Sequence, residues 1–191
     1  MTAREPTYPI NPIILKRASY RAMSGEDFSD DELMPLFEAA RWAPSSNNNQ
    51  PWRFVYTKRS SSNWDLFLSL LYPGNLIWCS NAAVLVVMIS KKLLDHNQKP
   101  SITHSFDAGA AWENLALEGT ARGYVIHAMQ GFDYDRAKKE LKVPDHYQVE
   151  AMIAIGKKGL KTDLPQELQK KESFTNRKPL KELLSEGIFS F

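Results

Sequence analysis

The sequence predicts a mixed fold of class α+β or α/β, because amphipathic helical stretches alternate along the chain with short apolar runs. Residues 29–41 repeat apolar side chains at helical spacing, whereas residues 83–89 form a continuous run rich in β-branched side chains. The 191 residues are enough for one domain with a substantial core, so we expect a single domain over residues 1–191. Periodicity alone does not determine the order or direction of the strands.

The first two helices are predicted from their capping residues. Asn11-Pro12 predicts the start of a short helix that runs toward Arg17, because Asn caps a helix and Pro favours its first turn. Ser29 and Glu32 form a capping box, and the apolar residues that follow predict one buried helical face: Leu33, Leu36, Phe37 and Ala40. Pro35 lies early enough to distort this helix without ending it.

Strands and helices alternate through the rest of the chain. We expect strands at Trp52–Thr57, Ala83–Ile89, Val125–Met129 and Val149–Ile155, and helices at Asn63–Leu71, Ser105–Arg122 and Asp133–Leu141. The apolar run at 83–89 is typical of a strand covered on both faces. The helix over 105–122 carries a small-residue face at Gly109, Ala110 and Ala111, which permits close approach of a neighbouring helix, a cofactor or a symmetry mate.

Composition excludes several classes of function. The net charge of +2 with 24% charged residues gives no broad electrostatic reason to expect a nucleic-acid partner. Cys79 is the only cysteine and the four histidines lack the spacing of a metal pair, so we expect no disulfide within the chain and no metal site. The longest apolar run is too short to cross a bilayer, which predicts a cytoplasmic protein without a membrane partner.

A polar loop between the second helix and the first strand is the most informative segment. It reads Ala43-Pro44-Ser45-Ser46-Asn47-Asn48-Asn49-Gln50-Pro51-Trp52. Hydroxyl and amide groups offer both donors and acceptors, which suits a planar heterocycle with mixed edges, and the two prolines would stiffen the loop. An ordinary polar turn has a similar composition. The loop alone therefore leaves both interpretations open.

Two further segments favour a ligand. Arg17, Ser19 and Arg21 supply two fixed cations and a hydroxyl within five residues, which is suitable for an anion such as phosphate. The turn Met129-Gln130-Gly131-Phe132-Asp133 follows an expected strand, and its glycine would let a ligand approach the backbone closely.

These three segments, in this order, resemble the FMN-dependent nitroreductases. The resemblance continues through Asp107–Ala111 with Asn114-Leu115, then Ala154–Gly156 and Arg177–Leu180, and so spans about residues 13 to 184. It implies an α+β fold with a mostly antiparallel sheet flanked by helices. It also implies a homodimer with exchanged C-terminal arms and two FMN sites at the interface.

At the phosphate and the flavin edge, the resemblance implies binding roles for individual residues. Arg17 and Ser19 would bind the phosphate and ribityl oxygens, and Arg177 would close the phosphate site. Arg21 would lie near flavin N1 and O2, where a cation stabilises the reduced ring. Thr175 stands where some members carry a second basic residue, which would weaken the phosphate site or leave more of it to Lys178.

Along the flavin ring, the resemblance implies contacts from loops and one turn. The polar loop would contribute Pro44, Ser45, Ser46 and Asn48, and Asn75 would contact the pyrimidine edge. The turn at Met129, Gln130 and Gly131 would place a backbone N–H against flavin N5. No catalytic side chain is expected, because the cofactor carries out the redox step. For His127 we favour a hydrogen-bonded structural role.

The C-terminal segment has two possible interpretations. Between Lys157 and Lys181 there are eight basic and three acidic residues, which is typical of a solvated tail but is also compatible with phosphate ligands. The chain then ends with Ile188, Phe189 and Phe191, which have no reason to lie in water. We therefore expect residues from about 160 to 191 to form an extended arm that docks on a second subunit.

The resemblance implies transfer of hydride from NADH or NADPH through FMN to a nitroaromatic, a quinone or a related small acceptor, by a ping-pong mechanism. One alternative is a dehalogenase or dehydrogenase of a specific metabolite, with a lid in the segment Lys91–Thr103. Another is a flavin-binding protein without catalytic activity.

Overall fold

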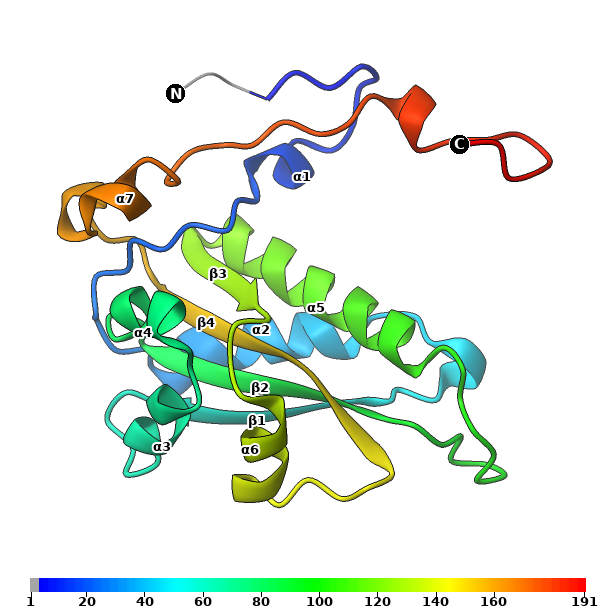
Figure 1. The fold of residues 1–191 in the computed structure, drawn as a ribbon, viewed down its shortest axis with the longest axis horizontal. Helices are drawn as coiled ribbons and strands as arrows, with labels where there is room; N and C mark the ends of the chain where they lie inside the picture. Colours follow the sequence, from blue (N-terminus) through cyan, green and yellow to red (C-terminus); the bar gives the residue numbers. More distant parts are fainter. Residues whose placement is uncertain (1–3) are drawn as a thin grey trace.

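Four antiparallel strands form the centre of the protein, whose computed structural model describes residues 4–191 (Figure 1). The strands are β1 (Trp52–Lys58), β2 (Val84–Lys91), β3 (Tyr124–Met129) and β4 (Tyr147–Lys157). Their order across the sheet is β1-β2-β4-β3. The α+β class with an antiparallel sheet is therefore confirmed.

The register of the sheet separates two of the predicted ligand segments. Trp52 at the start of β1 is paired with Ser90 of β2, whereas Met129 at the end of β3 is paired with Met152 of β4. β1 and β3 are the two edges of the sheet, three strand spacings or roughly 14 Å apart. The polar loop before β1 and the turn after β3 therefore leave the sheet from opposite edges.

Helices cover both faces of the sheet, as Figure 1 shows. α2 (Asp30–Arg41) and α5 (His104–Ala121) pack with one face, in a core that includes Leu33, Leu36, Leu115, Ile126 and Ile153. α3 (Trp64–Ser69), α4 (Pro73–Cys79) and α6 (Tyr134–Glu140) cover the other, with Trp64, Phe67, Trp78, Leu85 and Met152. From Val84 to Ser90 every residue of β2 is buried, as expected for a strand covered on both faces.

The capping residues begin the helices that they predict. Asn11 caps α1 (Pro12–Lys16) by accepting a hydrogen bond from the Ile13 N–H. Ser29 and Glu32 form both hydrogen bonds of the capping box of α2, which continues through Pro35. α4 is not predicted from the sequence, because its opening Pro73-Gly74-Asn75 is typical of a turn.

The two glycines of α5 differ in whether packing within the chain requires them. A Cβ at Gly119 would lie 2.4 Å from Cγ1 of Ile126, so this glycine lets the helix pack directly on β3. At Gly109, in contrast, an added Cβ would meet no atom within 4 Å. Ala111 is buried, but Gly109 is exposed. The face at Gly109 is therefore not required for packing within this chain.

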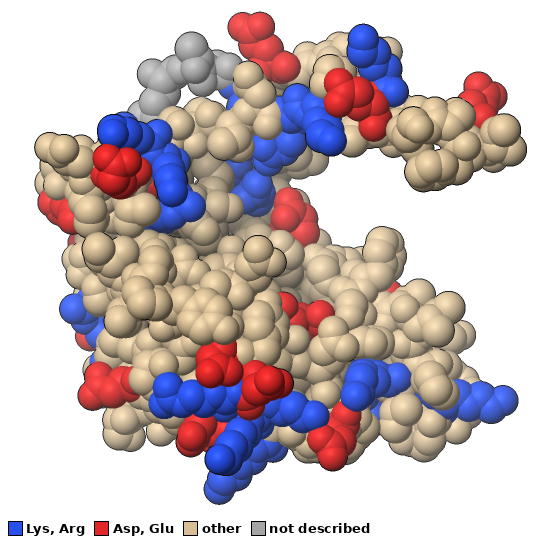
Figure 2. Space-filling model, viewed as in Figure 1, with Lys and Arg blue, Asp and Glu red and all other residues tan. Residues whose placement is uncertain are grey.

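After β4 the chain forms a long arm with little regular structure. It contains η2 (Lys161–Asp163), α7 (Gln166–Gln169) and η3 (Leu180–Glu182), and it crosses near α1 before its end projects away from the sheet (Figure 1). Figure 2 shows open space between the end of this arm and the body of the molecule. The exposed apolar residues of the arm are Leu160 near its start and, toward its end, Leu180, Leu183, Leu184, Ile188, Phe189 and Phe191.

Within residues 4–191, no helix combines the length and the apolar character that crossing a membrane requires.

Candidate functional site

A cavity of about 440 Å³ lies between the N-terminal segment and the C-terminal arm. We call it the basic cavity, because six of its lining side chains are cationic and none is acidic. The cationic residues are Arg4, Arg17, Arg21, Lys170, Lys171 and Arg177, and Ala18, Ser19, Ser173 and Thr175 complete the lining. The structure thus brings together Arg17, Ser19, Arg21 and Arg177, which are separated by up to 160 positions in the sequence.

Most of this positive charge has no carboxylate partner. Arg17 lies 3.7 Å from Glu113 of α5, and Lys170 lies 2.8 Å from Glu167. Within residues 4–191 the other four cationic side chains form no salt bridge. Burial, together with the guanidinium groups of Arg177 and Arg17, lowers the pKa of Arg4 from its ordinary value. These features favour an anionic ligand, because an anion would relieve the repulsion among the cations.

Arg4 is a site residue that the sequence analysis missed. One guanidinium nitrogen donates hydrogen bonds to the carbonyl groups of Leu15 and Arg17, at 3.0 and 2.6 Å. The guanidinium also lies 4.8 Å from the centre of the Phe174 ring. Its Nε is buried without a hydrogen-bond partner among the described residues.

Thr175 orients Arg177, which lies two positions further along the chain. Its hydroxyl accepts a hydrogen bond from Arg177 Nη1 at 3.0 Å, and its carbonyl oxygen lies 3.3 Å from the same nitrogen. Thr175 thus directs the Arg177 guanidinium. A weaker phosphate site at this position stays a prediction.

His127 of β3 supports the wall of the cavity from behind. Its Nδ1 lies 2.9 Å from the Tyr20 carbonyl oxygen, and its ring centroid is 4.6 Å from that of Trp78. Burial lowers the pKa of His127 to about 4, so the neutral imidazole donates its Nδ1–H to this carbonyl at neutral pH. The hydrogen-bonded structural role favoured from the sequence matches this geometry.

Asn75 and the turn after β3 lie side by side next to the basic cavity. Nδ2 of Asn75 donates to the Gly131 carbonyl at 3.1 Å, and Oδ1 accepts from the Trp78 indole at 3.3 Å. A Cβ at Gly131 would lie 2.5 Å from this Nδ2, so the close approach of Asn75 itself requires a glycine here. The Arg21 guanidinium lies 6.0 Å from the Trp78 ring, which connects this pair to the cavity wall.

The polar loop, of which residues 43–51 precede β1, is held by other parts of the same chain. It contains the 3-10 turn η1 (Ser46–Asn48), and Asn47, Asn48 and Gln50 have positive φ angles. The Ser45 hydroxyl accepts from the Gln50 N–H at 2.9 Å, and the buried Asp107 carboxylate accepts from the Ser46 N–H at 3.1 Å. These bonds fix a strained backbone conformation.

Asn49 joins the polar loop to the segment considered as a lid. Its amide donates to the Leu93 carbonyl at 3.2 Å and accepts from the Asp95 N–H at 2.8 Å. No pattern in the sequence predicts these contacts of Asn49. The segment Lys91–Thr103 therefore lies with the polar loop, and none of its residues lines the basic cavity.

A single chain does not bring all the predicted site residues together. None of Pro44, Ser45, Ser46 and Asn48 lines the basic cavity. Within the described residues, no hydrogen bond joins the polar loop to the cavity or to the turn at 129–131. The predicted ligand site is thus divided into two half-sites: the basic cavity with Asn75 and Gly131, and the polar loop.

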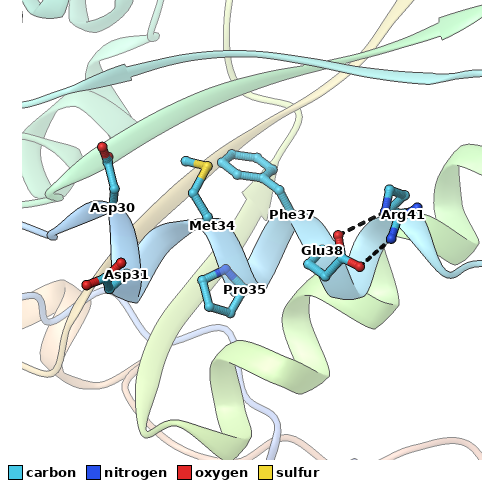
Figure 3. Close-up of a pocket in the computed structure, with 7 residues that line it drawn as sticks. All are labelled: Asp30, Asp31, Met34, Pro35, Phe37, Glu38 and Arg41. Carbon is cyan, nitrogen blue, oxygen red and sulfur yellow. Dashed lines mark hydrogen bonds and ion pairs between the residues drawn. The ribbon is translucent and has the colours of Figure 1, made fainter.

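A larger and more open hollow, of about 590 Å³, lies along α2 (Figure 3). Two of its three carboxylates have cationic partners: Glu38 is paired with Arg41, and Asp30 with Lys58, whereas Asp31 forms no salt bridge among the described residues. Hydrogen bonds from Arg41 and Trp42 lower the pKa of Glu38 to about 2. None of the predicted site residues lines this hollow. The basic cavity is therefore the better candidate site.

Comparison with known proteins gives a consistent set of relatives. The Nitroreductase family model matches residues 14–66 and 63–157. An NADH dehydrogenase of Thermus thermophilus is 27% identical over 186 residues, with 82% of this chain and 90% of the relative covered. The protein DrgA of a Synechocystis species is also 27% identical, with 74% and 82% covered.

Solved structures agree with these sequence matches. An oxidoreductase containing FMN is 43% identical, with 98% of this chain and 96% of that chain covered and a TM-score of 0.93. A nitroreductase homologue from Desulfovibrio desulfuricans, solved in complex with FMN, is 26% identical, with 95% and 100% covered and a TM-score of 0.72.

Proposed function

This chain belongs to the nitroreductase family, and on that premise we propose that it is an FMN-dependent oxidoreductase that passes hydride from NADH or NADPH to a small acceptor. The observation that carries the proposal is the basic cavity, whose unpaired cations lie next to the pair formed by Asn75 and Gly131. Relatives that contain FMN support the choice of cofactor.

The cavity fits the phosphate end of FMN. A phosphate group carries up to two negative charges, and Arg17 and Arg177 offer guanidinium groups suited to bidentate hydrogen bonds. The Ser19 hydroxyl lies 3.4 Å from the Arg17 guanidinium and adds a neutral donor. The Arg4 side chain, which also lines the cavity, adds a further positive charge at this end.

The neighbouring Asn75, Gln130 and Gly131 fit the ring end. When bound, FMN supplies reversible hydride chemistry, and the residues of this chain bind and orient it. Arg21 lines the cavity and lies 6.0 Å from the ring of Trp78, whose indole donates to Asn75. Its fixed positive charge would favour the reduced, anionic form of the ring.

We infer that the polar loop of a second copy completes the site, which requires a homodimer. The polar loop before β1 and the turn after β3 lie at opposite edges of the sheet of one chain. A two-fold axis would bring the polar loop of one chain to the basic cavity and the turn of the other. The arm supports this inference, because Leu183, Leu184, Ile188, Phe189 and Phe191 are each more than half exposed in the single chain. A partner surface would bury them.

The acceptor is proposed to be a nitroaromatic, a quinone or a related small molecule. One ring face would serve the nicotinamide donor first and the acceptor afterwards, which is a ping-pong sequence. The NADH dehydrogenase and nitroreductase names of the relatives favour this class of reaction.

Rapid anaerobic mixing tests the proposal. Purified protein should be yellow or become yellow with FMN, and NADH or NADPH should bleach the flavin absorbance before an acceptor restores it. Steady-state rates should give parallel double-reciprocal lines. Protein that binds no flavin would overturn the proposal, whereas bound flavin that neither nicotinamide reduces would favour a dehydrogenase of a specific metabolite.

A further inference from the structure

Glu172 is a buried carboxylate in the arm, and it is bonded only to the backbone of the N-terminal segment. Its exposed fraction is 6%. Oε1 accepts from the Arg21 N–H at 2.8 Å and from the Ala22 N–H at 2.9 Å, and Oε2 lies 3.1 Å from the Arg21 nitrogen. No other described residue accepts a hydrogen bond from these two N–H groups.

The position of Glu172 links the two walls of the basic cavity. Arg17, Ser19 and Arg21 form the wall on the N-terminal segment, and the wall on the arm consists of Lys170, Lys171, Ser173, Thr175 and Arg177. Glu172 does not line the cavity itself, but it lies between Lys171 and Ser173 in the sequence and binds the backbone at the end of the first wall. The next residue but one, Phe174, contacts the Tyr20 ring with centroids 6.1 Å apart.

His127 and Glu172 hold the backbone of residues 20–22 from two sides. His127 donates to the Tyr20 carbonyl from β3, whereas Glu172 accepts from the next two N–H groups from the arm. The backbone of residues 20–22 is therefore held by one side chain of the sheet and one of the arm. Only the Glu172 contact also fixes the position of the arm, which carries Lys170, Lys171 and Arg177.

We propose that Glu172 is a positioning residue for the phosphate end of the flavin site: it holds the arm wall of the basic cavity against residues 21 and 22. The proposal rests on the proposed function. Glu172 does not touch the ligand but fixes the separation of Arg17 and Arg21 from Arg177. A charged acceptor suits this role, because hydrogen bonds to an ionised group are stronger than neutral ones.

The affinities for FMN and riboflavin test the proposal, because riboflavin lacks only the phosphate. Glu172→Ala should weaken FMN binding about 10- to 100-fold and riboflavin binding less than about threefold. Glu172→Gln keeps one carbonyl acceptor and should retain part of the preference for FMN. The control Glu182→Gln makes the same charge change on an exposed residue of the arm and should leave both affinities unchanged.

Hydrogen exchange of flavin-free protein provides a second test. In Glu172→Ala and Glu172→Gln the amides of Arg21 and Ala22 should exchange faster, by at least about tenfold in the alanine variant. The Ser24 amide, which donates to the Lys157 carbonyl at 3.0 Å, should be unaffected.

Each outcome bears on one proposal. An unchanged preference for FMN in Glu172→Ala, equal losses for both ligands, or unchanged exchange at Arg21 and Ala22 would overturn the role of Glu172. If the alanine variant does not fold, Glu172→Gln gives the same comparisons. Wild-type protein that does not distinguish FMN from riboflavin would instead contradict the phosphate site, and with it the proposed function.

Discussion

The basic cavity leaves four of its six cationic side chains without a salt bridge among the described residues, whereas the polar loop uses its polar groups to bind its own chain. Ser45 bonds to Gln50, Asp107 accepts from the Ser46 backbone, and Asn49 bonds to the segment after β2. The cavity thus has an excess of positive charge, whereas several polar groups of the loop already have hydrogen-bond partners within the chain.

This difference indicates two kinds of contribution to one ligand site. A surplus of cations is stabilised when an anion binds, so the cavity should determine affinity for the phosphate. A loop fixed by internal hydrogen bonds presents a rigid surface, and its exposed Pro44, Ser46 and Asn48 should shape the space over the ring. Changes in the cavity should therefore act through the phosphate, and changes in the loop should not.

Deletion of residues 174–191 should have the largest effect, because it removes the apolar end of the arm together with Arg177. Dimerisation and flavin retention should be lost together, since a ligand bound only by the assembled form stabilises that form. Sedimentation and the flavin spectrum measure both. Arg177→Ala should lower FMN affinity and leave the dimer intact. A truncated protein that stays dimeric and yellow would show that the arm contributes to neither.

Acidification should destabilise the cavity wall through His127. Its folded pKa of about 4 is below its ordinary 6.5, so the folded state binds fewer protons than the unfolded state between these values. Stability should therefore fall by about 3 kcal/mol as the pH drops from 6.5 to 4. Urea unfolding of His127→Asn should lack this part of the pH dependence, which the exposed-histidine variant His96→Asn should keep. If the free energy of unfolding depends on pH equally in both variants, the predicted contribution of His127 is wrong.

Arg17→Ala should weaken FMN binding by about 1.5 to 3 kcal/mol, the usual range for a charge-assisted hydrogen bond. The loss should be much smaller for riboflavin. Lys16→Ala is the matched control, because Lys16 is exposed, carries the same charge and does not line the cavity. Titration calorimetry with both ligands gives the comparison. Equal losses for FMN and riboflavin would place Arg17 outside the phosphate site.

Ser45→Ala should have the smallest effect on phosphate recognition. Loss of the hydrogen bond from the Gln50 N–H should reduce the free energy of unfolding by about 1 kcal/mol. The ratio of FMN to riboflavin affinity should not change, because the polar loop does not line the basic cavity. A shift in that ratio comparable to the effect of Arg17→Ala would remove the distinction between the two regions.

Local patterns were sufficient to predict most of the fold. The capping residues Asn11 and Ser29 and the apolar run of β2 act through neighbours in the sequence, so their structures follow from short segments. α4 was missed because a proline and a glycine at its start favour a turn, and its burial of Trp78 depends on distant parts of the chain.

The site could be predicted only where motifs mark it. Arg17, Ser19 and Arg21 form a recognisable group, whereas Glu172 appeared only as one acidic residue in a basic tail. Its hydrogen bonds reach residues 150 and 151 positions away, and no local spacing encodes such a contact. Arg4 was missed for a related reason, because its importance depends on how the arm and the N-terminal segment fold together. The division into two half-sites likewise follows from strand order, which periodicity does not determine.

The central claim is that the basic cavity of one chain and the polar loop of its partner form one flavin site, and mixed dimers test it most directly. One chain carries Arg17→Ala with Arg177→Ala, and the other carries Ser46→Trp, which blocks the exposed face of the loop. Each homodimer should bind FMN weakly. The mixed dimer should recover one tight site, built from the intact cavity of one chain and the intact loop of the other. A mixed dimer with no tight site would contradict the account.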